Sequence, residues 1–141
     1  MKKILTVLTF VLLAVFGAAK ANAHTFSTGN MTGTIGKYKI VMSLTINDSN
    51  NTVSGWYYYK SKGPKNKIKL SGTFRELQPQ FGYTIHIDMK EYVGGKVTGT
   101  FNIDYYQQSK SGIDLMWIAG DFTTATGKTF EVSADRSDRR Q

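Results

Sequence analysis

A two-residue alternation of side-chain character constrains this chain more than any other feature of its sequence. It is plain in residues 52–60, TVSGWYYYK, where one phase comprises Val53, Gly55, Tyr57 and Tyr59 and the other comprises Thr52, Ser54, Trp56, Tyr58 and Lys60. Successive residues of a β-strand point to opposite faces of a sheet, so this pattern predicts a strand. The polar members belong to the second phase. We therefore expect Trp56 and Tyr58 to lie outside and Tyr57 to lie in the core.

A glycine followed two residues later by an aromatic ring recurs along the chain. The pairs are Gly55/Tyr57, Gly72/Phe74, Gly99/Phe101 and Gly120/Phe122. An inward-facing glycine lets a strand coil and leaves room for a large ring from a neighbouring strand, which is how small curved sheets close. Phosphate-binding loops instead carry their glycines in a loop that leads into a helix. The spacing therefore predicts a structural role.

Six further segments have the alternation or composition of strands and are separated by short polar turns. They are Lys37–Asn47, Lys67–Arg75, Phe81–Val93, Lys96–Tyr106, Ile113–Thr123 and Thr129–Ala134. A polar start, residues 24–34, precedes them, and no segment after residue 23 has a helical pattern. Seven strands joined by short turns form an antiparallel meander, whose apolar face must be buried by closure or by folding over. We predict an all-β fold, an up-and-down barrel of about seven to eight strands, with a β-sandwich as the alternative.

The segment Ile113–Thr123 departs from the pattern because both of its faces are apolar. Met116, Ile118 and Phe122 share one phase, and Leu115, Trp117 and Ala119 share the other. Such a strand is either covered on both faces or shifted in phase by a β-bulge. Trp117 lies outside by phase, and burial under the amino-terminal segment is the alternative.

The first 23 residues have the pattern of a secretory signal peptide. Lys2 and Lys3 precede the apolar run Ile4–Ala19, and Ala21-Asn22-Ala23 forms an A-x-A cleavage site. The run is short for a membrane span, and no later segment is apolar enough for one. The chain contains no cysteine, so it lacks the lipid-anchoring cysteine of bacterial lipoproteins. We predict a bacterial protein that is periplasmic or secreted.

Cleavage at that site leaves residues 24–141, enough for one domain with one core. We predict a single barrel domain over residues 24–134 and a charged tail over residues 135–141. Cleavage removes three of the 18 basic residues and none of the ten acidic ones, so the net charge falls from +8 to +5. This charge favours an anionic partner, such as an envelope polymer, a glycan or a lipid head group, and is too small to indicate nucleic acid.

Four short motifs share a strand rhythm. They are Val53-Ser54-Gly55-Trp56-Tyr57, Leu70-Ser71-Gly72-Thr73-Phe74, Thr98-Gly99-Thr100-Phe101 and Leu115-Met116-Trp117-Ile118. In this rhythm the chain resembles the small calycin-type barrels of the avidin and lipocalin group, over most of residues 24–141. The biotin-gripping loop of avidins and the Gly-x-Trp signature of lipocalins are not recognisable. The resemblance therefore implies a barrel architecture and no binding residue.

Few residues of the chain suit catalysis. Its histidines are His24 and His86, and it has no cysteine. His86 and Asp88 stand two residues apart on one strand face, with alpha carbons about 7 Å apart, where they either form an acid–base pair or simply face solvent. The acids Asp88, Asp104, Asp114 and Asp121 are too scattered to predict the carboxylate pair of a glycosidase. We predict no enzymatic activity, no catalytic residue and no cofactor.

His24 becomes the first residue of the chain if cleavage falls after Ala23. A free amino group and an imidazole nitrogen together chelate Cu(II), as in lytic polysaccharide monooxygenases and some periplasmic copper carriers, and His86 is available as a third ligand. No signature of either family surrounds His24. Copper binding is therefore an alternative prediction, and we assign no metal site.

Lysines gather beside the outward aromatic residues of the 52–60 strand. Lys60, Lys62, Lys65, Lys67 and Lys69 lie on one predicted hairpin with Trp56 and Tyr58. Aromatic rings stack on sugars while ammonium groups pair with acids; the alternative is a solubilising loop that protects strand edges. We predict an exported, non-catalytic binding or envelope-associated protein whose ligand-binding residues are Trp56, Tyr58, Lys60 and Trp117. The alternatives are the copper-binding protein and a structural envelope protein.

Overall fold

The computed structural model describes residues 25–78 and 82–139. These ranges contain strands and no helix, and hence no helix that is long and apolar enough to cross a membrane. The strands are β1 (Thr25–Ser27), β2 (Met31–Ile35), β3 (Tyr38–Asn47), β4 (Thr52–Tyr59), β5 (Ile68–Glu76), β6 (Tyr83–Val93), β7 (Lys96–Lys110), β8 (Ile113–Thr124) and β9 (Thr129–Arg139). The predicted signal peptide and His24 lie outside the described residues.

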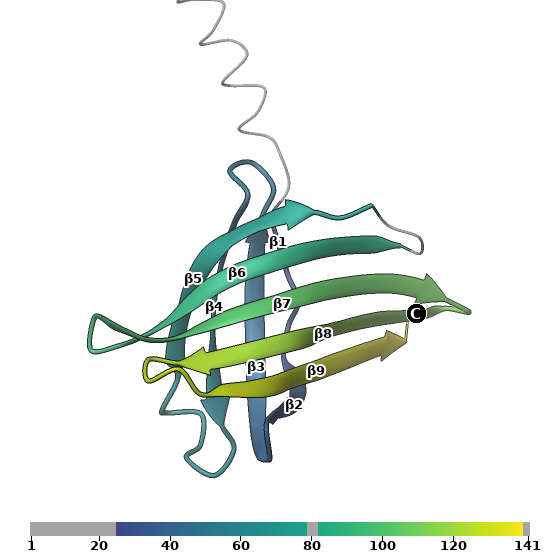
Figure 1. Ribbon diagram of the computed structural model, residues 1–141. Coiled ribbons are helices and arrows are strands. Elements are labelled where there is room, and N and C mark those ends of the chain that lie inside the picture. Colours follow the sequence, from purple (N-terminus) through teal and green to yellow (C-terminus); the bar gives the residue numbers. More distant parts are fainter. Residues whose placement is uncertain (1–24, 79–81, 140–141) are drawn as a thin grey trace, which may run out of the picture.

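The strands form one antiparallel sheet that closes on itself. From β2 to β9 each strand pairs with the next one along the chain, and β9 pairs with β2, so that eight strands close a barrel. The short strand β1 is additional and pairs with the end of β3. In Figure 1, β6 to β9 cross at a steep angle in front of β3 and β4. The predicted up-and-down barrel is confirmed, and the fold is not a sandwich.

Strand β2 completes the barrel, although the sequence predicts only a polar start over residues 24–34. Met31 and Ile35 point inward and are 0% and 2% exposed. The three residues between them, Thr-Gly-Thr, contribute no further apolar side chain. Two apolar residues are too few to reveal an alternating pattern, and the pairing with β3 and β9 determines that this segment is a strand.

The barrel interior is filled by side chains that the alternation places inward. Tyr57 and Phe101 are each 1% exposed, and their rings meet edge to face with centroids 5.5 Å apart. Gly99 leaves room for a neighbouring ring, as predicted, because a Cβ atom there would lie only 2.4 Å from Cε2 of Phe122. Among the described residues, one carboxylate enters this core: Glu91 is 6% exposed and accepts hydrogen bonds from the hydroxyl groups of Tyr57 and Thr98.

The apolar outer face of strand β8 is partly exposed. It pairs with β7 and β9 without a shift of register, so no bulge changes its phase. Leu115 and Trp117 are half-buried on the outer face and Ala119 is exposed, and no described strand lies over them. Both predicted explanations, the cover and the bulge, are therefore wrong for the described part of the chain.

Tyr38 and Val97 share the alternation phase of the inward residues of their strands, yet both are exposed. The register between β6 and β7 shifts between Glu91 and Tyr92, so Tyr92 pairs with Val97, which turns outward and is 46% exposed. This β-bulge lies next to a tight turn, where alternation is easily interrupted. Tyr38 is 52% exposed at the beginning of β3, where its ring meets Tyr59 edge to face.

The last strand is longer than the predicted segment Thr129–Ala134. Residues 135–139 continue the pairing with β8 as far as Ile113, so they belong to a strand and not to a frayed tail. Within this stretch, the Nη1 atom of Arg136 donates a hydrogen bond to the Thr28 carbonyl oxygen at 3.1 Å. Charged residues carry no apolar pattern, so the sequence alone gives no signal for this extension.

Candidate functional site

Trp56 and Tyr58 lie side by side on the outer face of β4, as their phase predicts. Their rings are stacked, with centroids 5.9 Å apart and planes 15° apart. The Lys67 ammonium nitrogen lies 4.3 Å from the centroid of the Trp56 ring. Val41, which pairs with Tyr58 in register, is 6% exposed although it is not part of the interior cluster. The aromatic pair thus covers the outside of the sheet while both rings stay half-exposed.

The predicted lysines lie on the loop between β4 and β5 and at the beginning of β5, and all are exposed: Lys60, Lys62, Lys65, Lys67 and Lys69. Hydrogen bonds order this loop. The Asn66 side-chain nitrogen donates to the Lys62 carbonyl oxygen at 2.6 Å, and the backbone nitrogen of Lys62 donates to the Tyr59 carbonyl oxygen. Within the described part of the chain, none of the five lysines forms a salt bridge. We call Trp56, Tyr58 and these five lysines the aromatic–lysine face.

Trp117 does not belong to this face. It lies on β8, and three strands separate β8 from β4 in either direction around the barrel. Its ring stacks on Tyr106, with centroids 5.0 Å apart and planes 13° apart. Its partner on β9 is Asp135, and the Tyr106 hydroxyl lies 3.5 Å from the Asp104 carboxylate. The structure therefore brings three of the four predicted ligand-binding residues together and places Trp117 on the opposite side, beside carboxylates.

His86 lies between two carboxylates on the outer face of β6 and β7. Its Nδ1 atom lies 2.7 Å from Oδ1 of Asp104, and its Nε2 atom lies 3.4 Å from Oδ1 of Asp88. Asn102 donates a hydrogen bond to the same Asp88 oxygen at 2.9 Å. The predicted proximity of His86 and Asp88 is observed. Both ring nitrogens therefore face carboxylates.

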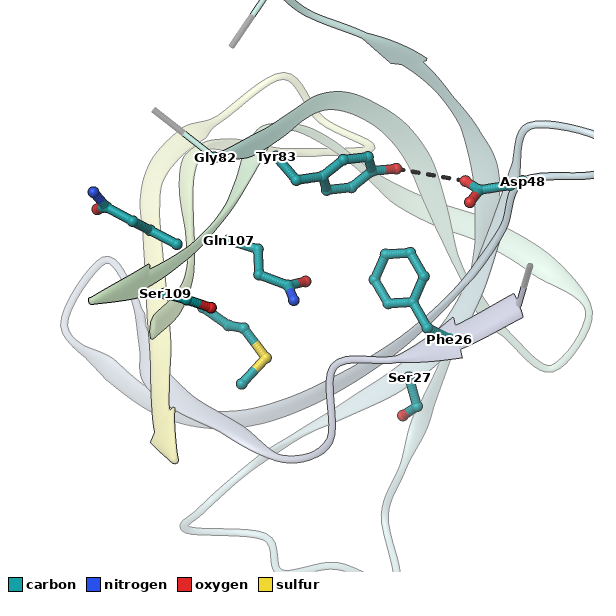
Figure 2. A pocket seen from close by; sticks show the side chains of 9 residues that line it. Phe26, Ser27, Asp48, Gly82, Tyr83, Gln107 and Ser109 are labelled. Carbon is teal, nitrogen blue, oxygen red and sulfur yellow. Dashed lines mark hydrogen bonds between the residues drawn. The ribbon is translucent and has the colours of Figure 1, made fainter. Parts of the chain in front are cut away.

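A hollow of about 830 Å³ lies at one end of the barrel, and the sequence did not reveal it (Figure 2). It is lined by Phe26, Ser27, Asp48, Gly82, Tyr83, Gln107, Gln108, Ser109 and Met116. Phe26, Tyr83 and Gln107 reach into it from different sides. We call this hollow the barrel mouth. A signal for it exists in the sequence, because Gln107 continues the inward phase of Tyr105 beyond the predicted end of its strand.

Hydrogen bonds orient the polar groups at the barrel mouth. The Tyr105 hydroxyl donates to Oε1 of Gln107 at 3.0 Å, and the Tyr83 hydroxyl lies 3.5 Å from Oδ1 of Asp48. Burial, together with the nearby carboxylates of Asp48 and Glu76, raises the pKa of Tyr83 to about 12. The Tyr83 side chain therefore stays a neutral phenol to a higher pH than an ordinary tyrosine.

The described residues, 25–78 and 82–139, hold no group of three or more metal-ligating side chains placed to share an ion. The copper alternative depends on His24, outside these ranges, so it stays a prediction. Comparison of the chain with models of protein families, with curated proteins and with solved structures yields no match. The geometry itself defines the class of protein: a small closed antiparallel barrel with a basic, aromatic outer face and a hollow at one end.

Proposed function

We propose that this chain is an exported, non-catalytic binding protein whose aromatic–lysine face holds an anionic polymer, glycan or lipid head group of the cell envelope. The observation that carries the proposal is the Lys67 ammonium group over the Trp56 ring, at 4.3 Å from its centroid, beside four further exposed lysines. Ammonium groups attract the acids of such a ligand, while the rings offer apolar contact to its carbon atoms. Export rests on the predicted signal peptide.

A purely solubilising role for these lysines accounts for less of the geometry. Lysines protect a sheet where a strand edge is unpaired, but β4 is paired on both sides, with β3 and with β5. The loop is ordered by its own hydrogen bonds, and one of its lysines is directed over a tryptophan ring. These contacts favour a binding surface. No described contact favours the structural-envelope alternative or the calycin relationship, and both stay predictions.

Replacing Trp56 with alanine is expected to weaken binding to an oligosaccharide of uronic acids about tenfold. The substitution removes a ring that the proposal places against the ligand, and a contact made by an aromatic ring contributes about 0.5–1.5 kcal/mol; about 1.4 kcal/mol is tenfold in affinity. Titration calorimetry at low ionic strength measures the change. Trp117→Ala is the matched control, since it removes an equally stacked ring from the opposite side of the barrel and should leave the affinity unchanged.

The remaining outcomes separate the ligand classes. Vesicles of anionic lipid, compared with zwitterionic vesicles, test the head-group form of the ligand, and an uncharged glucan tests whether charge is needed. If Trp56→Ala and Trp117→Ala lose the same amount of affinity, the loss is not specific to the aromatic–lysine face. Full affinity in the double variant Trp56→Ala/Tyr58→Ala would overturn the proposal.

A further inference from the structure

The barrel mouth combines aromatic rings from three strands. Phe26 of β1 and Tyr83 of β6 line it, and their rings meet edge to face with centroids 5.8 Å apart. Tyr105 of β7 lies behind them, 6.4 Å from each ring centroid. The Met116 side chain also lines the mouth. A ligand that enters therefore meets the electron-rich surfaces of rings and a polarisable sulfur atom.

Among the described residues that line the mouth, one carries a charge. Asp48 is the only charged residue among the nine described residues that line it, and the other polar ones are neutral serines and glutamines. No salt bridge joins Asp48 to a lysine or arginine within the described ranges. Its hydrogen-bond partner at the mouth is the Tyr83 hydroxyl, at the long distance of 3.5 Å (Figure 2). The Asp48 carboxylate thus faces the hollow without a salt bridge to a described cation; Arg136, which pairs with Met116 in register, is not among the lining residues and donates to the Thr28 carbonyl oxygen.

This pairing of rings with a carboxylate restricts what can bind. A neutral apolar ligand would cover Asp48 and remove its water without replacing it, which is unfavourable for a charged group. An anion would be repelled by Asp48. A cation with an apolar surface meets both requirements, because aromatic rings attract organic ammonium groups and the carboxylate neutralises them.

We propose that the barrel mouth binds a small organic ammonium cation, with its alkyl groups against Phe26 and Tyr83 and its charge beside Asp48. The neutral amides and hydroxyls of the rim, at Gln107 and Ser109 among others, provide hydrogen bonds to a polar substituent of the same ligand. This site is separate from the aromatic–lysine face, which has the opposite charge, and it does not depend on the function proposed for that face.

The test compares choline with 3,3-dimethylbutan-1-ol, its uncharged counterpart of the same shape, on the protein purified from a host that exports it. Binding is followed by NMR through the Met116 methyl group and the Gln107 side-chain amide. We expect choline to shift both signals in a saturable way and to bind about tenfold more tightly than the alcohol. Equal affinity of the two probes, or no shift of either signal with choline, would overturn the proposal.

Single substitutions test which residues at the barrel mouth bind choline. Asp48→Asn should weaken choline binding about tenfold and leave binding of the alcohol unchanged. Asp121→Asn is the matched control, since it removes the same charge from an exposed position on β8 and should change neither affinity. Tyr83→Phe keeps the ring and should retain choline binding. If Asp48→Asn fails to fold, the comparison of choline with the alcohol on the unaltered protein still tests whether the barrel mouth prefers a cation.

Discussion

Above about pH 10 the barrel is expected to lose stability steeply, because two buried tyrosines cannot ionise while the barrel stays closed. Tyr57 is 1% exposed and Tyr105 is 0% exposed. Burial raises the pKa of both phenols well above the ordinary value, and the hydrogen bond to the Glu91 carboxylate raises the pKa of Tyr57 further. In the unfolded chain both groups ionise near pH 10.

The sign of the effect follows from that difference. A group whose pKa is raised by folding contributes its full stability below the unfolded pKa and loses it as the pH rises toward the folded pKa. Between these limits the unfolded chain releases a proton that the folded chain retains. Each tyrosine should then lower the free energy of unfolding by about 1.4 kcal/mol per pH unit.

Urea unfolding at several pH values between about 9 and 11 measures this slope. Tyr57→Phe and Tyr105→Phe should each reduce the slope by about 1.4 kcal/mol per pH unit. Tyr57→Phe also lowers stability at neutral pH by about 1–3 kcal/mol, because it removes a donor from a buried carboxylate; the slope is therefore the quantity to compare. Tyr38→Phe is the control, since Tyr38 is 52% exposed. Phenolate absorbance from every tyrosine near pH 10 in the folded protein would contradict the prediction.

Replacing Gly72 with alanine is expected to destabilise the barrel by about 3 kcal/mol, at the upper end of the range for overpacking. A Cβ atom at this position would lie 2.0 Å from the Asp88 carbonyl oxygen and 2.5 Å from the Met89 alpha carbon. Both are backbone atoms of β6, so no change of rotamer relieves the contact. Strands β5 and β6 must separate locally, against the pairing of Gly72 with Met89.

Thermal and urea unfolding of Gly72→Ala measure this loss. Ser71→Ala is a suitable control, because Ser71 is the neighbouring residue, lies on the other face of β5 and should change stability by less than about 0.5 kcal/mol. Gly99→Ala should cost less than Gly72→Ala, since the atoms nearest to its added Cβ belong to the side chains of Phe122 and Glu91 and not to the backbone. If Gly72→Ala is as stable as the unaltered protein, β5 and β6 do not lie as close together as described.

The alternation of the sequence predicts the strands well where apolar residues are frequent. The predicted segment Lys37–Asn47 becomes β3 and the aromatic segment Thr52–Lys60 becomes β4, with Tyr57 inside and Trp56 outside as expected. Prediction fails where the pattern is thin or interrupted. Strand β2 has only Met31 and Ile35 as apolar markers, the end of β9 is charged, and the bulge beside Tyr92 reverses the direction of Val97.

The candidate sites also differ in how far local sequence predicts them. Trp56, Tyr58 and the lysines are close in sequence, so a hairpin brings them together whatever the rest of the fold does. Trp117 has the same outward phase, but its position depends on how many strands lie between β4 and β8. No local pattern contains that information, because it depends on the order and closure of the whole sheet.

That this protein is built of strands, and that most of the apolar side chains of its clearly alternating segments face the interior, follows from local sequence, because the direction of a side chain alternates within a single strand. The folded barrel was needed to show that β2 and β9 meet to close it, that the two tryptophans lie on opposite sides, and that Phe26, Asp48 and Tyr83 surround one hollow. These residues come from distant segments. Their meeting depends on the register of long-range pairing, which is set by the packing of the whole core.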